Sequence, residues 1–304
     1  YVQLYNEPEL AVEWEDSAGG DEEWKIKTYC NRWMAAANWI RNRGGYPGIQ
    51  LLWPEWMERL LTKVMAEDPS LFDRAWFSPH NYAGNHPPEY PYDSLNPGKT
   101  IEDDYFAHLL PLKVDGIIRR IVGRPLPMIC GEGGWCYGNS DDNRYPKTDY
   151  VTHRDYHIEA FEQFRTGILP NGAPLPDSWF ASTPWLLVNM AVGGGDMGFE
   201  ENAWYSGTLS GDKTLTIEAM KAMTPFVRKF SWDGATPVPE PVPTPEPTPT
   251  PTPNPQPFKL ELAFGEFAAK YPTLKLTPTS VMYQVTPTLV MQKVNAKKTP
   301  SILT

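Results

Sequence analysis

The stretch Tyr5-Asn6-Glu7-Pro8 closes an apolar run at residues 1–4 and places a carboxylate directly after it. A second apolar run, at residues 127–131, also leads into a glutamate, Glu132. Short apolar runs of this kind are typical of buried strands. Two glutamates at the ends of two strands are the material for paired acid and base chemistry.

Short apolar segments alternate with amphipathic ones along the first two thirds of the chain. The pattern predicts helices at residues 22–43, 55–65, 101–122 and 152–166, with Pro111 kinking the third. A final helix is expected to carry Met220, Met223, Val227 and Phe230 on one face. Strands are predicted at residues 1–4, 48–53, 75–80, 127–132 and 185–190.

This alternation favours parallel βα units and the α/β class. Both a doubly wound sheet and a (β/α)8 barrel (TIM barrel) fit it. In a barrel the reactive side chains lie at the C-terminal ends of several different strands. Glu7, His80, Tyr82 and Glu132 fall at such ends, and the chain has no glycine-rich nucleotide-binding motif. The sequence therefore favours the barrel.

Composition excludes some classes of partner. The 304 residues are 41% hydrophobic, enough for a large core, and carry a net charge of −10 without a basic run, which argues against nucleic acid. No apolar stretch has the length of a membrane helix. The cysteines, Cys30, Cys130 and Cys136, do not form a disulfide framework or a metal-ligand spacing. Cys130 and Cys136 could form a bridge, and buried thiols are the alternative.

The ordered set of strand-end motifs resembles the clan A glycoside hydrolases. Asn6-Glu7-Pro8, then His80-Asn81-Tyr82 two units later, then Glu132 resemble the ends of the fourth, sixth and seventh strands of that clan. The resemblance covers residues 1–235 and implies a retaining (β/α)8 barrel that is incomplete, with strands 4 to 8. Three βα units would then precede residue 1. Either the chain is truncated, which we expect, or a partner supplies the missing units.

The resemblance also implies roles for individual residues. Glu7 would be the acid/base and hold a proton, while Glu132 would be the nucleophile and stay ionised. Asn6 would bind the sugar 2-hydroxyl, Tyr82 would donate to the nucleophile, and His80 would bind a sugar hydroxyl or orient Tyr82. The competing interpretations are glutamates stabilised by helix dipoles, an Asn6 that caps a turn, and a His80 satisfied in packing.

Twelve tryptophans suit a carbohydrate ligand, because the apolar faces of sugar rings stack on indole. Trp204, after the last predicted strand, is the expected platform under the reacting sugar, and Trp185 is its rival. Trp53 and Trp135 follow strand ends on the same face. Core packing is the alternative for each of the four.

The predicted function is hydrolysis of β-linked oligo- or polysaccharide by double displacement, with a carbohydrate partner, no cofactor and no metal. One alternative is a non-catalytic carbohydrate-binding barrel or an inactive truncated fragment. Another is a metal-dependent hydrolase that uses His153 and His157, four residues apart on a predicted helix. For these two histidines a solvated helix face is the favoured interpretation.

The tail has a different composition. Every second residue from 236 to 257 is proline, which predicts an extended polyproline linker. Linkers of this type join secreted catalytic domains to accessory modules, so we expect an extracellular protein. Residues 258–304 are basic and strand-prone, with a possible helix at 264–271. They are expected to form a small β-rich accessory module, or a fragment of one, for glycan or cell-surface attachment.

Overall fold

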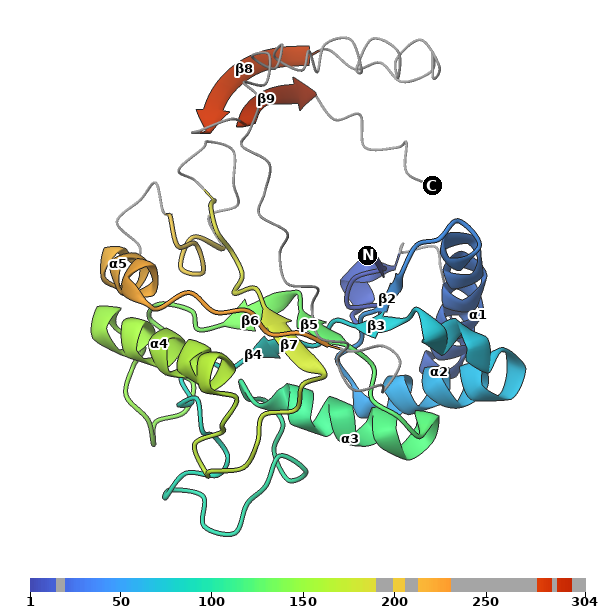
Figure 1. The fold of residues 1–304 in the computed structure, drawn as a ribbon, viewed down its shortest axis with the longest axis horizontal. Helices are drawn as coiled ribbons and strands as arrows, with labels where there is room; N and C mark the ends of the chain where they lie inside the picture. The colour runs from blue at the N-terminus through green and yellow to red at the C-terminus, as the bar shows by residue number, and fades with distance from the viewer. Residues whose placement is uncertain (15–19, 190–198, 206–212, 231–277, 286–288, 297–304) are drawn as a thin grey trace, which may run out of the picture. The chain divides into compact units, whose positions relative to one another are not determined.

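The computed structural model describes residues 1–14, 20–189, 199–205, 213–230, 278–285 and 289–296 (Figure 1). The chain divides into two units, Tyr1–Pro237 and Val238–Thr304. In the second unit, β8 (Pro278–Val285) and β9 (Leu289–Ala296) form an antiparallel hairpin. The expected linker at 236–257 and helix at 264–271 lie outside the described residues.

The first unit is built on a parallel sheet of five strands. Each strand pairs with its neighbour in the order β1-β2-β3-β5-β7. Helices connect successive strands, so the unit is a mixed α/β fold, as the alternation predicts. The bounds of the strands are β1 (Val2–Leu4), β2 (Pro47–Ile49), β3 (Trp76–Phe77), β5 (Met128–Cys130) and β7 (Trp179–Ser182).

A second, two-stranded parallel sheet extends two of these strands. β4 (His80–Tyr82) follows β3, and β6 (Glu132–Gly134) follows β5 after a single glycine. That glycine, Gly131, leaves no room for a side chain, because a Cβ there would lie 2.6 Å from the Ser78 hydroxyl oxygen. The predicted strands at 75–80 and 127–132 are thus each split in two, and the C-terminal pieces carry the candidate site residues.

The described part of the first unit has five α-helices, and Figure 1 shows α1 and α2 near β2 and β3, with α4 and α5 at the opposite end of the unit. Asp21 and Asp149 cap α1 and α4 by accepting backbone N–H groups of the first turn. Gly123 and Gly167 end α3 and α4 in the left-handed conformation. The helices are α1 (Glu22–Arg41), α2 (Pro54–Glu67), α3 (Leu110–Val122), α4 (Tyr150–Thr166) and α5 (Thr214–Ala222).

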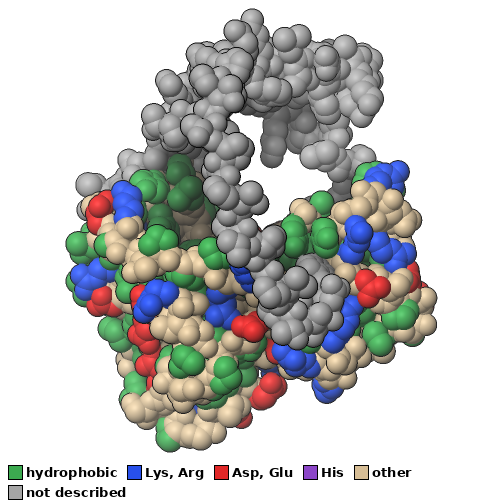
Figure 2. All heavy atoms as spheres, in the orientation of Figure 1, with side chains coloured by type: hydrophobic (Ala, Val, Ile, Leu, Met, Phe, Trp, Pro, Cys, Tyr) green, Lys and Arg blue, Asp and Glu red, His purple; other side chains and the backbone are tan. Residues whose placement is uncertain are grey.

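The core lies between the helices and the sheet and is rich in aromatic residues. Trp33 of α1 and Trp56 of α2 are almost fully buried, as are Phe77 of β3 and Trp179 of β7. The Trp33 indole N–H donates to the carbonyl oxygen of Gly48 at 3.0 Å, so α1 is joined to β2 by a polar contact as well as by packing. On the face shown in Figure 2, acidic and basic side chains are interspersed.

The predicted strand at 185–190 is wrong. The fifth strand of the sheet is β7. The described part of the segment after it forms no strand, although it makes an isolated bridge between Val188 and Tyr205 and a backbone hydrogen bond from Trp185 to Gly133. Leu187 is 65% exposed, so the apolar run that suggested a buried strand is partly on the surface. Met190 lies outside the described residues.

Two helix predictions also need correction. Pro111 does not kink a helix, because α3 begins beside it, where a missing backbone N–H has no cost. The expected apolar face of the last helix does not form, since α5 ends at Ala222. Met223 is its C-terminal cap, and Val227 lies beyond it with 82% of its surface exposed. Phe230 also lies beyond the helix.

Among the helices that the structure describes, none has the length and apolar character needed to cross a membrane.

Candidate functional site

Glu7 lies in a strained turn directly after β1. Tyr5 and Glu7 have φ values of 63° and 38°, in the left-handed region that side-chain-bearing residues rarely adopt. The backbone N–H of Glu7 donates to the side-chain oxygen of Gln50, a fully buried residue after β2. Non-glycine residues are held in such conformations where the surrounding structure determines them, often at functional sites.

His80 and Glu132, the first residues of the paired strands β4 and β6, meet Glu7 beyond the C-terminal ends of β3 and β5. The register of β4 and β6 pairs His80 directly with Glu132. The Nδ1 atom of His80 lies 2.8 Å from Oε1 of Glu7 and 3.6 Å from Oε2 of Glu132. The imidazole is fully buried, whereas the two carboxylate side chains are 19% and 25% exposed. Both glutamates therefore remain open to a ligand.

Tyr82 completes this cluster from the end of β4. Its hydroxyl donates to Oε2 of Glu132 at 2.8 Å. Burial, followed by the negative charge of Glu132, raises the pKa of Tyr82 far above its ordinary value. The phenol therefore stays protonated at all ordinary pH values, and it supplies Glu132 with a permanent hydrogen-bond donor.

The cluster has two chemical capabilities. Two partly exposed carboxylates with fixed hydrogen-bond partners can act as proton donor, proton acceptor or nucleophile. The same groups could also hold a divalent metal, because one ligand atom each from Glu7, His80 and Glu132 lie within 4.8 Å of one another. A metal there would replace the hydrogen bond between His80 and Glu7.

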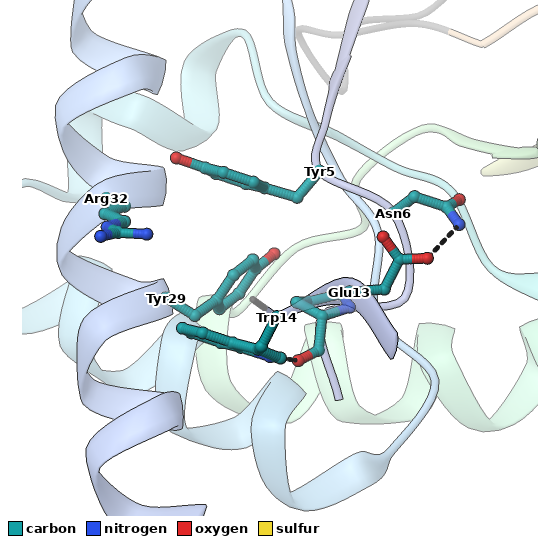
Figure 3. Close-up of a pocket in the computed structure, with 7 residues that line it drawn as sticks. Tyr5, Asn6, Glu13, Trp14, Tyr29 and Arg32 are labelled. Carbon is teal, nitrogen blue, oxygen red and sulfur yellow. Dashed lines mark hydrogen bonds between the residues drawn. The ribbon is translucent and has the colours of Figure 1, made fainter. Parts of the chain in front are cut away.

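Asn6 does not join this cluster. Its side-chain amide donates to Oε1 of Glu13 at 3.5 Å, and it lines a neighbouring pocket with Tyr5, Trp14 and other residues of the β1–α1 segment (Figure 3). Glu7 and Glu132 are not among the lining residues that the structure describes. The predicted contact of Asn6 with a sugar 2-hydroxyl therefore stays a prediction.

Of the four candidate tryptophans, the structure brings Trp185 to the cluster. Its ring packs edge-on to Tyr82, with centroids 6.4 Å apart, and it is half-buried. Trp204 packs against His157 at 5.0 Å. Trp135 is a core residue, with 2% exposure and its indole N–H donating to a backbone carbonyl. Trp53 lies at the N-terminus of α2 with 37% exposure.

Sequence reasoning missed two buried polar residues behind Glu7. Gln50 accepts a hydrogen bond from the Glu7 backbone. A polar residue inside the apolar run at 48–53 is the sequence feature that could have identified it. Glu9 is 6% exposed and accepts the backbone N–H groups of Leu52 and Trp53 at 2.6 and 3.0 Å. Burial raises the pKa of Glu9, although these hydrogen bonds oppose the shift. Glu9 is therefore bonded to the backbone after β2, whereas Glu7, two residues earlier, contacts His80.

The interpretation of His153 and His157 as a solvated helix face is wrong, because each is 1% exposed. Nδ1 of His157 donates to the backbone carbonyl of His153, and Nδ1 of His153 bonds to the Thr216 hydroxyl of α5, both at 2.7 Å. The His153 contact joins α4 to α5, whereas the His157 contact lies within α4. In the described part of the chain, the one group of three residues that could hold a metal ion is Glu7, His80 and Glu132. His153 and His157 do not belong to it.

The three cysteines are free, so Cys130 and Cys136 do not form a bridge. Cys30 and Cys130 are buried thiols and Cys136 is half-buried. Burial raises the pKa of the Cys30 thiol to about 11, so it is protonated and unreactive at neutral pH.

No protein-family model, curated protein or solved structure matches this chain. The functional assignment therefore depends on the sequence motifs and on the geometry of the cluster.

We expect the buried histidines to make the folded protein less stable in acid. Burial lowers the pKa of His108 to about 3 and that of His157 to about 4. A histidine in the unfolded chain has a pKa near 6.5, so below that pH the unfolded state binds more protons than the folded state. The free energy of unfolding therefore decreases as the pH is lowered. Each histidine should remove roughly 2 kcal/mol from the free energy of unfolding between pH 7 and pH 5. Urea denaturation of the full chain at both pH values measures this loss.

Two variants separate titration from packing. His108→Phe should reduce the difference in stability between pH 7 and pH 5, whatever it does to stability at neutral pH. Leu109→Ala, at the adjacent buried residue, should lower stability by the same amount at both pH values. Equal pH dependence in the wild type and in His108→Phe contradicts the prediction.

Proposed function

We propose that this chain is a retaining glycoside hydrolase that cleaves β-linked oligo- or polysaccharide. The observation that carries the proposal is that one carboxylate oxygen of Glu7 and one of Glu132, both partly exposed, lie within 4.8 Å of each other. Retaining enzymes place their carboxyl groups about 5 to 5.5 Å apart, whereas inverting enzymes leave about 6.5 to 9.5 Å for a water molecule. The spacing therefore favours double displacement. The consecutive parallel strands support a barrel of which this chain holds strands 4 to 8.

The reaction proceeds in two displacements. Glu132 attacks the anomeric carbon while Glu7 gives its proton to the leaving oxygen, so the glycosidic bond breaks as a glycosyl ester forms. Glu7, now ionised, takes a proton from water, and the resulting hydroxide attacks the anomeric carbon and releases Glu132. Overall, one water is consumed and the anomeric configuration is retained.

The neighbours of the two glutamates fit these roles. The Tyr82 hydroxyl stabilises Glu132 as an anion and fixes the oxygen that it touches. His80, buried between the carboxylates, orients Glu7 through its 2.8 Å contact. Trp185 is the stacking platform that we favour, ahead of Trp204, because it contacts Tyr82 directly. No metal or organic cofactor takes part in this mechanism.

The remaining proposals concern the setting of the enzyme. We propose a carbohydrate substrate and no nucleic-acid partner. We also propose an extracellular location, because the residues at 236–257 have the proline-rich composition of a linker. The second unit, with its β8–β9 hairpin, is proposed to be an accessory module for glycan or cell-surface attachment.

The first functional prediction concerns the two glutamates. Glu132→Gln should lower kcat on aryl β-glycosides by about 10⁴-fold or more, because the nucleophile is lost. Glu7→Ala should lose about 10² to 10⁴-fold on poor leaving groups and much less on activated ones, which need no proton. Azide should rescue Glu7→Ala and yield a β-glycosyl azide, which NMR identifies.

The control is Glu55→Gln, at an exposed glutamate in the first turn of α2, which should keep wild-type rates. The experiments use the full chain of 304 residues. Full activity in either active-site variant contradicts the proposal. Calorimetric binding of oligosaccharide without product release would instead indicate a non-catalytic carbohydrate-binding protein.

A second prediction concerns Tyr82. Tyr82→Phe removes the hydrogen bond to ionised Glu132, which should lower kcat/KM by about 10 to 100-fold. Because the phenol touches Glu132 and not Glu7, the loss should be of similar size for activated and for poor leaving groups. Initial rates on both kinds of aryl β-glycoside measure it. Wild-type kcat/KM in Tyr82→Phe contradicts the prediction.

A second candidate function is metal-dependent hydrolysis at the same cluster, because Glu7, His80 and Glu132 form a metal-capable group. This candidate predicts that dialysis against EDTA abolishes activity and that Zn²⁺ or Mn²⁺ restores it. The glycosidase mechanism predicts unchanged rates after the same dialysis. Calorimetric titration with Zn²⁺, in the wild type and in His80→Ala, measures metal binding independently of activity.

A further inference from the structure

A separate pocket lies beside the Glu7 cluster, between the turn after β1 and helix α1. It has a volume of about 220 Å³ and is lined by Tyr5, Asn6, Pro8, Glu13, Trp14, Tyr29 and Arg32 (Figure 3). Sites for drug-sized ligands measure about 300 to 1,000 Å³, so this one has room for a single ring-sized group.

The lining combines aromatic surfaces with opposite charges. The rings of Tyr5, Trp14 and Tyr29 lie between Arg32, on α1, and Glu13, on η1 (Ala11–Glu13), as Figure 3 shows. Aromatic faces stack on the apolar faces of sugar rings. The guanidinium only donates hydrogen bonds and the carboxylate only accepts them, whereas a sugar hydroxyl can do both. This combination suits a pyranose ring that spans the pocket.

The aromatic walls are held in place before any ligand binds. The Trp14 indole N–H donates to the Pro8 carbonyl at 2.7 Å, and Tyr29 is 2% exposed with its ring 5.6 Å from that of Tyr5. Arg32, by contrast, has no ion pair with a described residue, and its donors are available to a ligand. A pre-formed wall reduces the entropy cost of binding.

The pocket belongs to the Glu7 side of the cluster. Tyr5, Asn6 and Pro8 flank Glu7 in the chain, and the Tyr29 hydroxyl donates to the backbone carbonyl of Gln50, whose side chain holds the Glu7 N–H. The residue that protonates the leaving oxygen adjoins the leaving group. The pocket is therefore on the side of the departing sugar.

We propose that this pocket binds one sugar ring of the leaving group, with Arg32 and Trp14 as its specificity-determining residues. The proposal rests on the glycosidase function proposed above and adds which residues bind the departing sugar.

The test compares two substrates of the same glycosyl unit, a β-linked disaccharide and the β-glycosyl fluoride, whose leaving group is too small to reach the pocket. The panel covers glucose, mannose, xylose and galactose. The measured quantity is kcat/KM for the disaccharide divided by kcat/KM for the fluoride. Arg32→Met should lower this ratio by about 10-fold or more, because the charged hydrogen-bond donor is lost. Trp14→Ala should lower the same ratio.

The matched controls are Lys27→Met and Trp39→Ala. Lys27 is an exposed cation and Trp39 an exposed indole, and both lie on α1 outside the pocket lining. Both should keep the wild-type ratio. An unchanged ratio in Arg32→Met and Trp14→Ala overturns the proposal, as does a decrease of equal size in the controls.

Direct binding keeps this test separate from the proposed function. If no glycoside is hydrolysed, the function fails, and the four disaccharides are titrated against the wild type and both pocket variants by saturation-transfer NMR. Binding that is lost in Arg32→Met and Trp14→Ala supports the pocket on its own. No binding to the wild type, or equal binding in all variants, overturns it.

Discussion

The parallel pairing of β4 with β6 is the constraint on which the candidate site depends. Its register sets His80 opposite Glu132 and brings the Tyr82 hydroxyl to the same carboxylate. Gly131 fits between the paired strands, because a Cβ there would lie 2.6 Å from the Ser78 hydroxyl oxygen. A change of one residue in this register would turn His80 away from Glu132, since neighbouring side chains of a strand point to opposite faces.

Glu7 reaches this pair by a different route. It lies in a turn, and its position is set by left-handed backbone conformations and by a hydrogen bond to a buried glutamine after the next strand. The turn directs Glu7 toward His80, while its neighbours Tyr5 and Asn6 line the adjacent pocket. One short segment thus contributes both to the reacting groups and to the surface that we assign to the departing sugar.

Elements with strong local signals were predicted well. Helices α1, α2 and α4 begin and end close to the predicted residues, because an aspartate cap, a proline or a glycine marks their ends. β7 was missed because its four residues carry only a weak pattern, whereas the longer apolar run after it resembled a strand and is partly exposed. Pairing with β5 decides which segment enters the sheet, and pairing is a long-range property.

The sequence by itself determined the class of the fold and the two glutamates, because periodicity and the residues that follow a strand are local features of a chain. Only the tertiary structure showed that Gln50 holds the backbone of Glu7, that Asn6 lines a separate pocket and that Trp135 is buried in the core. Contacts between residues far apart in the chain depend on strand register and helix packing, and neither is encoded within a single segment.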